Sequence, residues 1–340
     1  MTADRHPRLL SWWRDDPRDP GRPRANDPDV LRLANQLAPG SSAHDLGGVM
    51  SLNLRLDPAG LVLRVHQPFA SQARLLALQQ VRSCLADTGL IVPVTLERLD
   101  KRLFRCRNRW AELESFIPHT RLPPSFDSYG WLFEQVGIPH RGMSSIEPAS
   151  PRPLVATWTT PDSLRRWLGM TEATVAHDPE AVEIAARVRG LGRRLERVWV
   201  PPARLPVQLV HGDARLSNIC RTPDGHSVFF DFGFAAVRPR VHDLAYALVF
   251  VTLGMDGARA PQSLAWDVIP ALISAYEQAA GIHLLADESS ALLPYAVAVL
   301  LYHAALDGFT ADPVGLLRSR WPWILLAKWM LDNPAALAVR

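Results

Sequence analysis

The chain has 340 residues, 48% of them apolar and 21% charged, which is the composition of an ordinary globular protein long enough to form two cores. The formal net charge of +3 comes without a long basic run with interleaved aromatic residues, so nucleic-acid binding is disfavoured. Three scattered cysteines with no Cys-x-x-Cys pair argue against a disulfide framework or a zinc site, and they favour a reducing cytoplasm.

The first 26 residues are rich in Arg, Asp and Pro and predict a loosely held arm whose Trp12-Trp13 pair packs on the first lobe. They lack the apolar core of a signal peptide. The longest apolar stretch, near residues 291 to 302, contains Pro294 and is too short to span a bilayer, so no membrane role is expected. A helix should follow the arm, with Asp27 as its N-cap and Pro39-Gly40 ending it.

Residues 46 to 117 predict mainly strands. Two of them, 50 to 56 and 61 to 65, should form a hairpin around the turn 57 to 60, with Gly47-Gly48 at its entrance. Further strands are expected at 92 to 99, 103 to 107 and 110 to 117. Between the hairpin and these strands, a helix from 71 to 87 buries one face, formed by Leu75, Leu78, Val81, Arg82 and Leu85.

The second half of the chain predicts mainly helices. One should run from 126 to 136 and end in the segment 137 to 140, which contains a Gly and a Pro, and another should run from Asp178 to Val198. Residues 141 to 162 show no periodicity and contain several prolines, which predicts a long irregular insert. Four more helices are expected, at 244 to 253, 264 to 280, 291 to 306 and 314 to 331.

The most informative polar residues lie between the two sets of helices. A short apolar run from 206 to 210 ends at His211 and Gly212, and Asp213 follows in what should be a loop at the end of a strand. Asn218 comes five residues later. This spacing lets one loop direct a carboxylate toward an acceptor hydroxyl while an amide carbonyl holds a cation.

A second carboxylate should return to the same place. The segment 223 to 225 is a turn signal, and the β-rich run 228 to 230 predicts the second strand of a hairpin that ends on Asp231 beside Asn218. Hard oxygen ligands of this kind suit Mg²⁺, which bridges to substrate phosphates. A hairpin with solvated acidic residues is the alternative.

The segment from 209 to 244 resembles the active site of the aminoglycoside phosphotransferase and choline kinase-like family, relatives of the protein kinases. The resemblance implies an α+β, bilobal fold with an antiparallel sheet and a helix in the N-lobe and a mainly helical C-lobe. It implies that Asp213 is catalytic, that Asn218 and Asp231 bind the metal, that Asp243 braces the catalytic loop, and that His211 orients it.

The same resemblance assigns nucleotide-binding residues in the N-lobe. Arg64 would grip the phosphates, with an exposed strand residue as the alternative, while Gly48 and Ser51 would lie near the phosphates and backbone groups from Glu114 to Phe116 would meet the adenine. In kinases a helix glutamate pairs with the basic residue of the strand. No acid lies between residues 57 and 87 here, so the ion pair is expected to be lost, with a neutral acceptor in its place from among Gln72, Gln79 and Gln80.

These assignments divide the chain into an arm and helix (1–40), a nucleotide-binding N-lobe with a hinge near 114–120 (41–120), and a catalytic, acceptor-binding C-lobe (121–340). The expected activity is transfer of the γ-phosphoryl group of ATP or GTP, with Mg²⁺, to a small hydroxylated acceptor such as an aminoglycoside, another antibiotic, a sugar or an amino alcohol. A nucleotide-binding pseudokinase with a scaffolding role is the alternative, and the oligomeric state is left open. Four acids are candidates for a cationic acceptor: Asp256, Asp267, Glu277 and Asp307.

Overall fold

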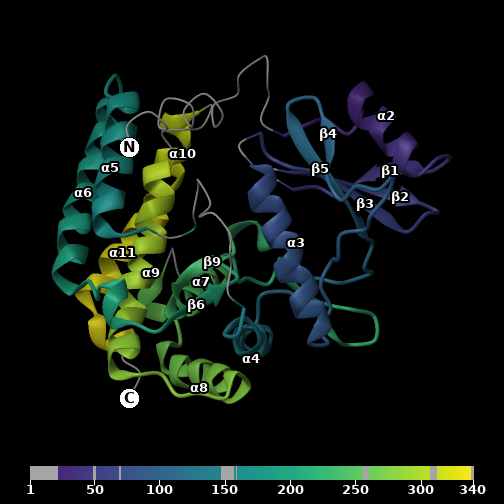
Figure 1. The fold of residues 1–340 in the computed structure, drawn as a ribbon. Helices are drawn as coiled ribbons and strands as arrows, with labels where there is room; N and C mark the ends of the chain where they lie inside the picture. Colours follow the sequence, from purple (N-terminus) through teal and green to yellow (C-terminus); the bar gives the residue numbers. More distant parts are fainter. Residues whose placement is uncertain are drawn as a thin grey trace. The chain divides into compact units, whose positions relative to one another are not determined.

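The computed structural model describes residues 22–48, 51–68, 70–146, 157, 159–255, 260–306 and 312–337 (Figure 1). Within these residues the chain forms two compact units, the first up to His119 and the second from Thr120 onward. The expected arm with its Trp12-Trp13 pair lies largely outside the described residues.

The first unit contains a five-stranded antiparallel sheet of order β1-β2-β3-β5-β4. Its strands are β1 (Ser42–Asp45), β2 (Leu52–Asp57), β3 (Leu61–Val65), β4 (Phe104–Cys106) and β5 (Arg109–Ser115). The β2–β3 hairpin is confirmed, but the edge strand β1 was not expected, because its mostly exposed residues carry no apolar alternation. Gly47 and Gly48 therefore lie in the loop of a β1–β2 hairpin. The expected strand at 92 to 99 is wrong; among the described residues it contributes only isolated bridges, at Thr95 and Arg98.

Two helices cover opposite faces of this sheet. Helix α2 (Pro28–Leu37) starts at the predicted cap, where the Asp27 carboxylate accepts from the N–H of Asp29, and it packs on the apolar face of the sheet. Helix α3 (Gln72–Asp87) is capped by Ser71 and covers the other face. Successive residues of a strand point to opposite faces, so Leu113 of β5 joins the apolar core while Glu112 and Glu114 face α3.

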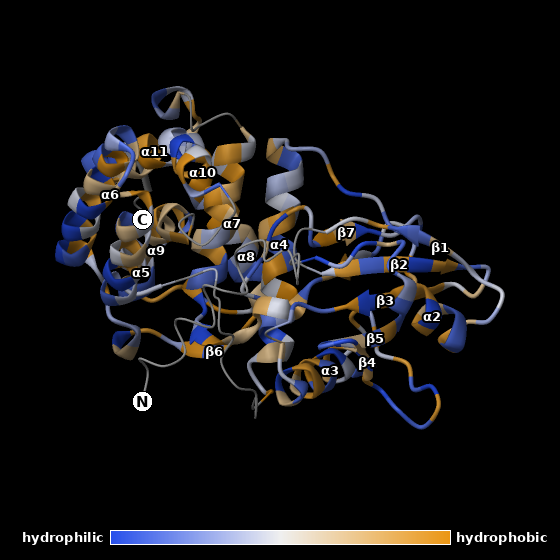
Figure 2. Ribbon diagram, turned by 90° about the horizontal axis from the view of Figure 1, so that it is seen from above, coloured by the Kyte–Doolittle hydropathy of each residue, from blue (hydrophilic) through white to orange (hydrophobic). Residues whose placement is uncertain are grey.

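The second unit is mainly helical. The long helix α9 (Ala286–Leu306) packs against four others and is largely buried among them. It is long and apolar enough to cross a membrane, a property that the core helix of a compact unit shares. Helix α6 (Pro179–Val198) is amphipathic, with hydrophilic and apolar residues alternating along its length (Figure 2). The remaining helices are α4 (Phe126–Met143), α5 (Pro161–Val175), α7 (Val241–Gly254), α8 (Ile269–Ala280), α10 (Pro313–Ser319) and α11 (Trp321–Asp332).

The helices of this unit differ from expectation in several places, and α7, α8 and α9 begin at Val241, Ile269 and Ala286 instead of at residues 244, 264 and 291. Helix α4 runs through Gly137 and Pro139 rather than ending there, because Gly137 is a packing position: a Cβ at this residue would lie 2.6 Å from the carbonyl oxygen of Tyr276 on α8. Helix α5 occupies a stretch for which no element was expected. The single helix expected from 314 to 331 is two helices that meet at Arg320.

Four short strands form two small antiparallel ladders that carry the candidate site. Strand β6 (Val207–Val210) pairs with β9 (Ala236–Pro239), and β7 (Ile219–Arg221) pairs with β8 (Ser227–Phe229) in the predicted hairpin. Asp213 and Asn218 lie between β6 and β7, and Asp231 follows β8. Single 3₁₀ turns complete the chain at Pro202–Arg204, Phe232–Phe234, Pro261–Ser263, Trp266–Val268 and Pro334–Leu337.

Candidate active site

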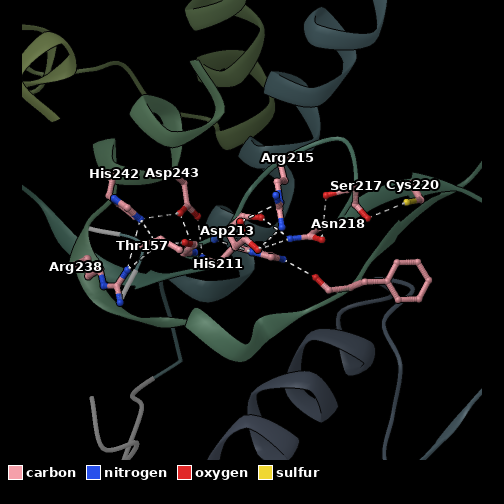
Figure 3. A network of polar contacts seen from close by, with 12 residues as sticks. Thr157, His211, Asp213, Arg215, Ser217, Asn218, Cys220, Arg238, His242 and Asp243 are labelled. Atoms are coloured by element: carbon pink, nitrogen blue, oxygen red, sulfur yellow. Dashed lines mark hydrogen bonds and ion pairs between the residues drawn. The ribbon is translucent and has the colours of Figure 1, made fainter. Parts of the chain in front are cut away.

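The loop after β6 is held by a buried carboxylate from α7. Asp243 accepts hydrogen bonds from the backbone N–H groups of His211 and Gly212, each at 2.8 Å, and from Nε2 of His140 at 3.0 Å (Figure 3). Burial alone would raise the pKa of Asp243, but the bond from His140 and the nearby histidines lower it below its ordinary value. The carboxylate thus stays ionised and fixes two consecutive peptide units.

His211 connects this loop to the turn that carries Asp231. Its Nδ1 accepts from the N–H of Asp213 at 3.2 Å, and its Nε2 donates to the carbonyl oxygen of Phe230 at 2.8 Å. A backbone N–H can only donate and a carbonyl can only accept, so these two contacts require the neutral Nε2–H tautomer. Both ring nitrogens are thus engaged within the protein, so the ring connects the loop to Phe230.

Gly212 is required by its backbone and by its neighbours. Its φ of +81° lies in the left-handed region, and a Cβ would collide with the carbonyl oxygen of Phe234. Its own carbonyl accepts from the hydroxyl of Thr157, which also contacts His242 at 3.2 Å. Burial and the charge of Arg238 lower the pKa of His242 to about 3, so this second histidine is neutral as well.

Asn218 lies directly against Asp213. Its Nδ2 donates to the carbonyl oxygen of Asp213 at 2.9 Å and to Oδ2 of the same residue at 2.7 Å. The acceptor end of the amide, Oδ1, is thereby turned away from Asp213 and contacts only a neutral donor, the Ser217 hydroxyl, at 3.3 Å. The carbonyl oxygen of Asn218 accepts from the N–H of Phe230 at 2.8 Å, which brings Asn218 next to the turn that holds Asp231.

These residues fit a magnesium ion. Asn218 contributes an amide oxygen, and Asp231, held at a φ of +58°, contributes a carboxylate whose charge acts on Asp213. The two side chains offer one carboxylate and one amide oxygen, and the part of the chain that the structure describes contains no group of three or more His, Cys, Asp or Glu side chains that could hold an ion. Mg²⁺ keeps several waters and accepts such a small set when phosphates supply further oxygens.

Asp213 is buried, with 2% of its surface exposed. Burial raises its pKa; the charge of Arg215 opposes the rise, and the charge of Asp231 adds to it. Nε of Arg215 lies 3.1 Å from Oδ1 of Asp213, and the nearby Tyr246 hydroxyl acts to lower the pKa of this carboxyl. The guanidinium of Arg215 and the phenol of Tyr246 therefore both lie near the Asp213 carboxylate.

The first unit contains a buried ionic network around the strand that carries Arg64. Arg82 of α3 donates to Glu112 at 2.6 Å and to Glu114 at 2.5 Å, both on β5. Arg64 lies opposite Glu112 in the β3–β5 ladder, and its charge acts on Glu114. A buried ionic contact between α3 and the sheet is therefore present in which the helix supplies the cation and β5 supplies the acids, whereas in kinases the helix supplies the acid.

Further side chains complete the network. Glu112 also accepts from Nε2 of Gln79 at 2.9 Å and contacts Nε2 of His66 at 2.9 Å. Of the three glutamines considered as acceptors, Gln79 alone lies in the network, and there its amide is a donor. Burial would raise the pKa of Glu112, but Arg82 and His66 lower it well below its ordinary value, whereas burial and the neighbouring carboxylate raise the pKa of Glu114.

The other expected nucleotide residues lie in the same unit. Gly48, at a φ of +118°, packs so closely on Ser51 that a Cβ would lie 2.8 Å from the Ser51 carbonyl oxygen. The Ser51 hydroxyl is buried and has no hydrogen-bond partner among the described residues, as a group that meets a phosphate would. The N–H of Phe116 donates to the carbonyl oxygen of Gly60 at 2.9 Å, and Glu114 and Ser115 lie opposite Val62 and Leu61 in the β3–β5 ladder.

Several site residues were not found from the sequence. Arg215 had a signal, since it lies two residues after Asp213, and Arg82 had one, since it lies on the buried face of its helix. His140 had none, because it reaches the site from α4, which is distant in sequence, and Tyr246 lies one helical turn after Asp243 on α7.

Comparison with known proteins agrees with this geometry. A model of the phosphotransferase enzyme family matches residues 51–290. No curated protein matches the chain in sequence. Among solved structures, the microcompartment-associated aminopropanol kinase is 14% identical, with a TM-score of 0.69 over 92% of this chain and 99% of that chain.

Two further structures have the same fold. Amicoumacin kinase, solved with AMP-PNP, Ca²⁺ and Ami, is 14% identical, with a TM-score of 0.65 over 91% of this chain and 94% of that chain. A choline/ethanolamine kinase family protein from Mesorhizobium loti is 14% identical, with a TM-score of 0.59 over 92% and 98%. The expected α+β protein-kinase-like fold is confirmed, and because the family model covers more than half of the chain, this protein belongs to the phosphotransferase enzyme family.

Proposed function

We propose that the protein is a small-molecule kinase that transfers the γ-phosphoryl group of ATP or GTP to a hydroxyl group. The observation that carries the proposal is the arrangement of one loop, in which Asp213 and Asn218 are in direct contact and are tied through His211 and Phe230 to Asp231. The amicoumacin kinase complex with AMP-PNP and Ca²⁺ supports a nucleoside triphosphate and a divalent ion as the natural ligands.

Asp213 is the proposed catalytic residue. The acceptor oxygen forms a bond to the γ-phosphorus while the bond from that phosphorus to the β–γ bridging oxygen breaks, and the hydroxyl proton passes to Asp213. A carboxylate whose pKa is raised by burial is the better base for this transfer. Asn218 and Asp231 would hold Mg²⁺, and the ion would neutralise part of the negative charge of the phosphates. Asp243 and His211 keep the loop in place.

Arg64, Gly48 and Ser51 are the proposed phosphate-binding residues. A guanidinium pairs two phosphate oxygens at once and stays charged at any working pH. The two glutamates of β5 would orient Arg64 in the way that a helix glutamate orients the lysine of protein kinases. Backbone groups between Glu114 and Phe116 would contact the base.

By function, the proposed division of the chain is an arm and helix over 1–40, a nucleotide-binding part over 41–120 with a hinge near 114–120, and a catalytic and acceptor-binding part over 121–340.

The test is phosphate transfer by the purified full chain. With Mg²⁺ and ATP or GTP, a panel of aminoglycosides, other antibiotics, sugars and amino alcohols is screened for the mass of a phosphoryl adduct. Asp213→Ala should reduce turnover by at least about a thousandfold while nucleotide affinity stays within about twofold. Asp224→Ala, in the exposed turn of the β7–β8 hairpin, is the matched control. Full activity of Asp213→Ala would refute the assignment.

A nucleotide-binding pseudokinase is the competing function. The missing helix glutamate favours a pseudokinase, but the carboxylates of β5 count against it because Glu112 lies opposite Arg64 in the sheet. Nucleotide binding without Mg²⁺-dependent transfer to any acceptor would favour it over the kinase. We also propose a cytoplasmic location, since Cys84, Cys106 and Cys220 are all free thiols, as a reducing compartment would keep them.

A further inference from the structure

The acid that braces the loop after β6 is itself held by a histidine of α4. Asp243 receives hydrogen bonds from the backbone N–H groups of His211 and Gly212, which belong to the loop that this acid holds. Its third bond comes from outside the loop, from Nε2 of His140 at 3.0 Å. Of the three donors, His140 is therefore the one that ties the carboxylate to a separate helix.

The ring of His140 is fixed at its other nitrogen as well. Nδ1 lies 3.0 Å from the hydroxyl of Tyr276 on α8, and the two rings meet edge to face with their centres 5.6 Å apart. Burial raises the pKa of the Tyr276 phenol, so it keeps its proton and can donate to Nδ1. A carboxylate only accepts, so Nε2 of His140 carries the proton that points at Asp243. The two contacts together set the rotation of the imidazole.

The backbone around His140 is held in place too. Its carbonyl oxygen accepts from Nε2 of Gln208 at 3.0 Å, and Gln208 lies on β6, the strand that leads into the loop. Three residues before His140, Gly137 allows the close contact between α4 and α8. His140 thus contacts the strand in front of the loop through its backbone and the acid behind the loop through its side chain.

Burial makes these contacts costly to lose. His140 is 2% exposed, and Tyr276 and Asp243 are 0% exposed. A buried carboxylate that loses a donor has no bulk water to replace it. Without His140, the Asp243 carboxylate would keep the two N–H groups of the loop but would lose its printed contact with α4. The loop and its acid could then move together.

We propose that His140 is a positioning residue for phosphoryl transfer, which fixes the Asp243 carboxylate relative to α4 and α8 and through it sets the place of Asp213. This rests on the proposed function, because Asp213 is the residue that would accept the proton. The two N–H groups that Asp243 binds belong to the two residues immediately before Asp213. A displacement of about 1 Å in a reacting group can lower a rate by about a hundredfold, so a small movement of the loop is sufficient.

The described acids that were considered for a cationic acceptor have other places. Glu277 follows Tyr276 on α8, but it accepts from the N–H of Leu284 at 2.7 Å. Asp267 is exposed on the 3₁₀ turn before α8. Asp256 and Asp307 lie outside the described residues. The charge of the acceptor is therefore left to the substrate screen.

Two substitutions separate the hydrogen bond of His140 from the bulk of its ring. His140→Leu fills a similar volume without a donor, whereas the side-chain amide in His140→Gln can take the place of Nε2. In the full chain, His140→Leu should lower kcat by about tenfold or more with the KM for the nucleotide within about twofold, and His140→Gln should keep most of the wild-type kcat. An equal loss in the two variants would overturn the role of the donor.

Arg141→Gln is the matched control. Arg141 is the next residue of α4 and joins the same two helices, since it donates to the carbonyl oxygens of Ala279 at 2.7 Å and Ala280 at 3.5 Å. Its loss weakens the contact between α4 and α8 and leaves the bond to Asp243 intact, so kcat should stay within about twofold of wild type. A fall in kcat equal to that of His140→Leu would mean that only helix packing matters and would contradict the proposal.

Tyr276→Phe tests the second contact of the imidazole. It removes the hydroxyl and keeps the ring, so it also probes these contacts if His140→Leu does not fold. The substitution should lower kcat about threefold in the wild type but have no further effect in His140→Leu, because residues that act through one another are not additive. An unchanged kcat in the wild-type background, or equal losses in both backgrounds, would rule out the part assigned to Tyr276.

Hydrogen–deuterium exchange reads the position of the loop without turnover. Peptides that cover residues 207 to 218 should exchange at least about tenfold faster in His140→Leu than in wild type, His140→Gln or Arg141→Gln, because the N–H groups of the loop lose their fixed acceptor. This result without phosphoryl transfer by the wild type would support the positioning role and count against the proposed kinase function. Unchanged exchange and unchanged kcat in His140→Leu would refute the positioning role and leave the kinase activity established.

Discussion

Replacing Arg82 with Met should destabilise the first unit far more than an ordinary arginine substitution. The methionine keeps most of the side-chain volume, but Glu112 and Glu114 lose the guanidinium that contacts both, at 2.6 and 2.5 Å. All three side chains are at least nine-tenths buried, so water cannot replace the lost charge. Removing one partner from a buried ion pair typically costs about 3–5 kcal/mol, because a charge is left buried without compensation.

Hydrogen–deuterium exchange, read peptide by peptide, measures this loss locally. Peptides that cover β3 and β5 should lose protection in Arg82→Met, whereas those of α7 and α9 in the second unit should not. Arg102→Met is the control in the same unit: its pair with Glu97 is 3.5 Å long and more than half exposed, and should contribute about 0–1 kcal/mol. Adding Glu114→Gln to Arg82→Met should restore part of the protection. Equal protection in the two arginine variants would refute the reasoning.

Three further outcomes are expected. Asp231→Ala should abolish the Mg²⁺-dependent part of nucleotide affinity, measured by calorimetry with and without the ion; an unchanged Mg²⁺ effect would contradict its role as a ligand. Gly212→Ala should lower kcat at least about tenfold, because a methyl group there displaces the loop from Phe234; Gly190→Ala on α6, where nothing lies within 4 Å, should leave activity unchanged. Stability should fall as the pH drops from about 6.5 to 4, because His303 stays unprotonated in the folded state down to about 4 while the unfolded chain already binds the proton. Melting temperatures across this range should fall less steeply for His303→Gln, and equal slopes would disprove this contribution.

The sequence predicted those helices and strands whose formation depends on residues that are close together in the chain. Asp27 caps its helix as expected, because a cap needs only a side chain and a nearby N–H. The β7–β8 hairpin follows from its turn residues. By contrast, β1 is a strand because β2 offers it an edge, and α4 continues past Gly137 because α8 packs against that glycine. Both depend on a partner distant in sequence.

The candidate site likewise contains residues that a local pattern signals and residues that only a contact distant in sequence brings together. The spacing of Asp213, Asn218 and Asp231 was visible because the three residues lie on one loop and one hairpin. The hydrogen bond from His140 to Asp243 joins residues 103 positions apart, and no local pattern signals it. The buried ionic contact between α3 and β5 was missed for a different reason: the sequence was searched for an acid on the helix, whereas a buried arginine on the same helix serves a network whose acids lie on the strand.

The position of those acids bears on how such an enzyme is controlled. Protein kinases are switched off when their glutamate-bearing helix moves outward and breaks the contact with the strand. Here both acids are on β5, the immediate hydrogen-bonded neighbour of the strand that carries Arg64, so the sheet sets their position relative to Arg64. Displacement of α3 would remove the cation from these acids instead of an acid from the basic residue, so it would leave two buried carboxylates without Arg82 beside the strand of Arg64.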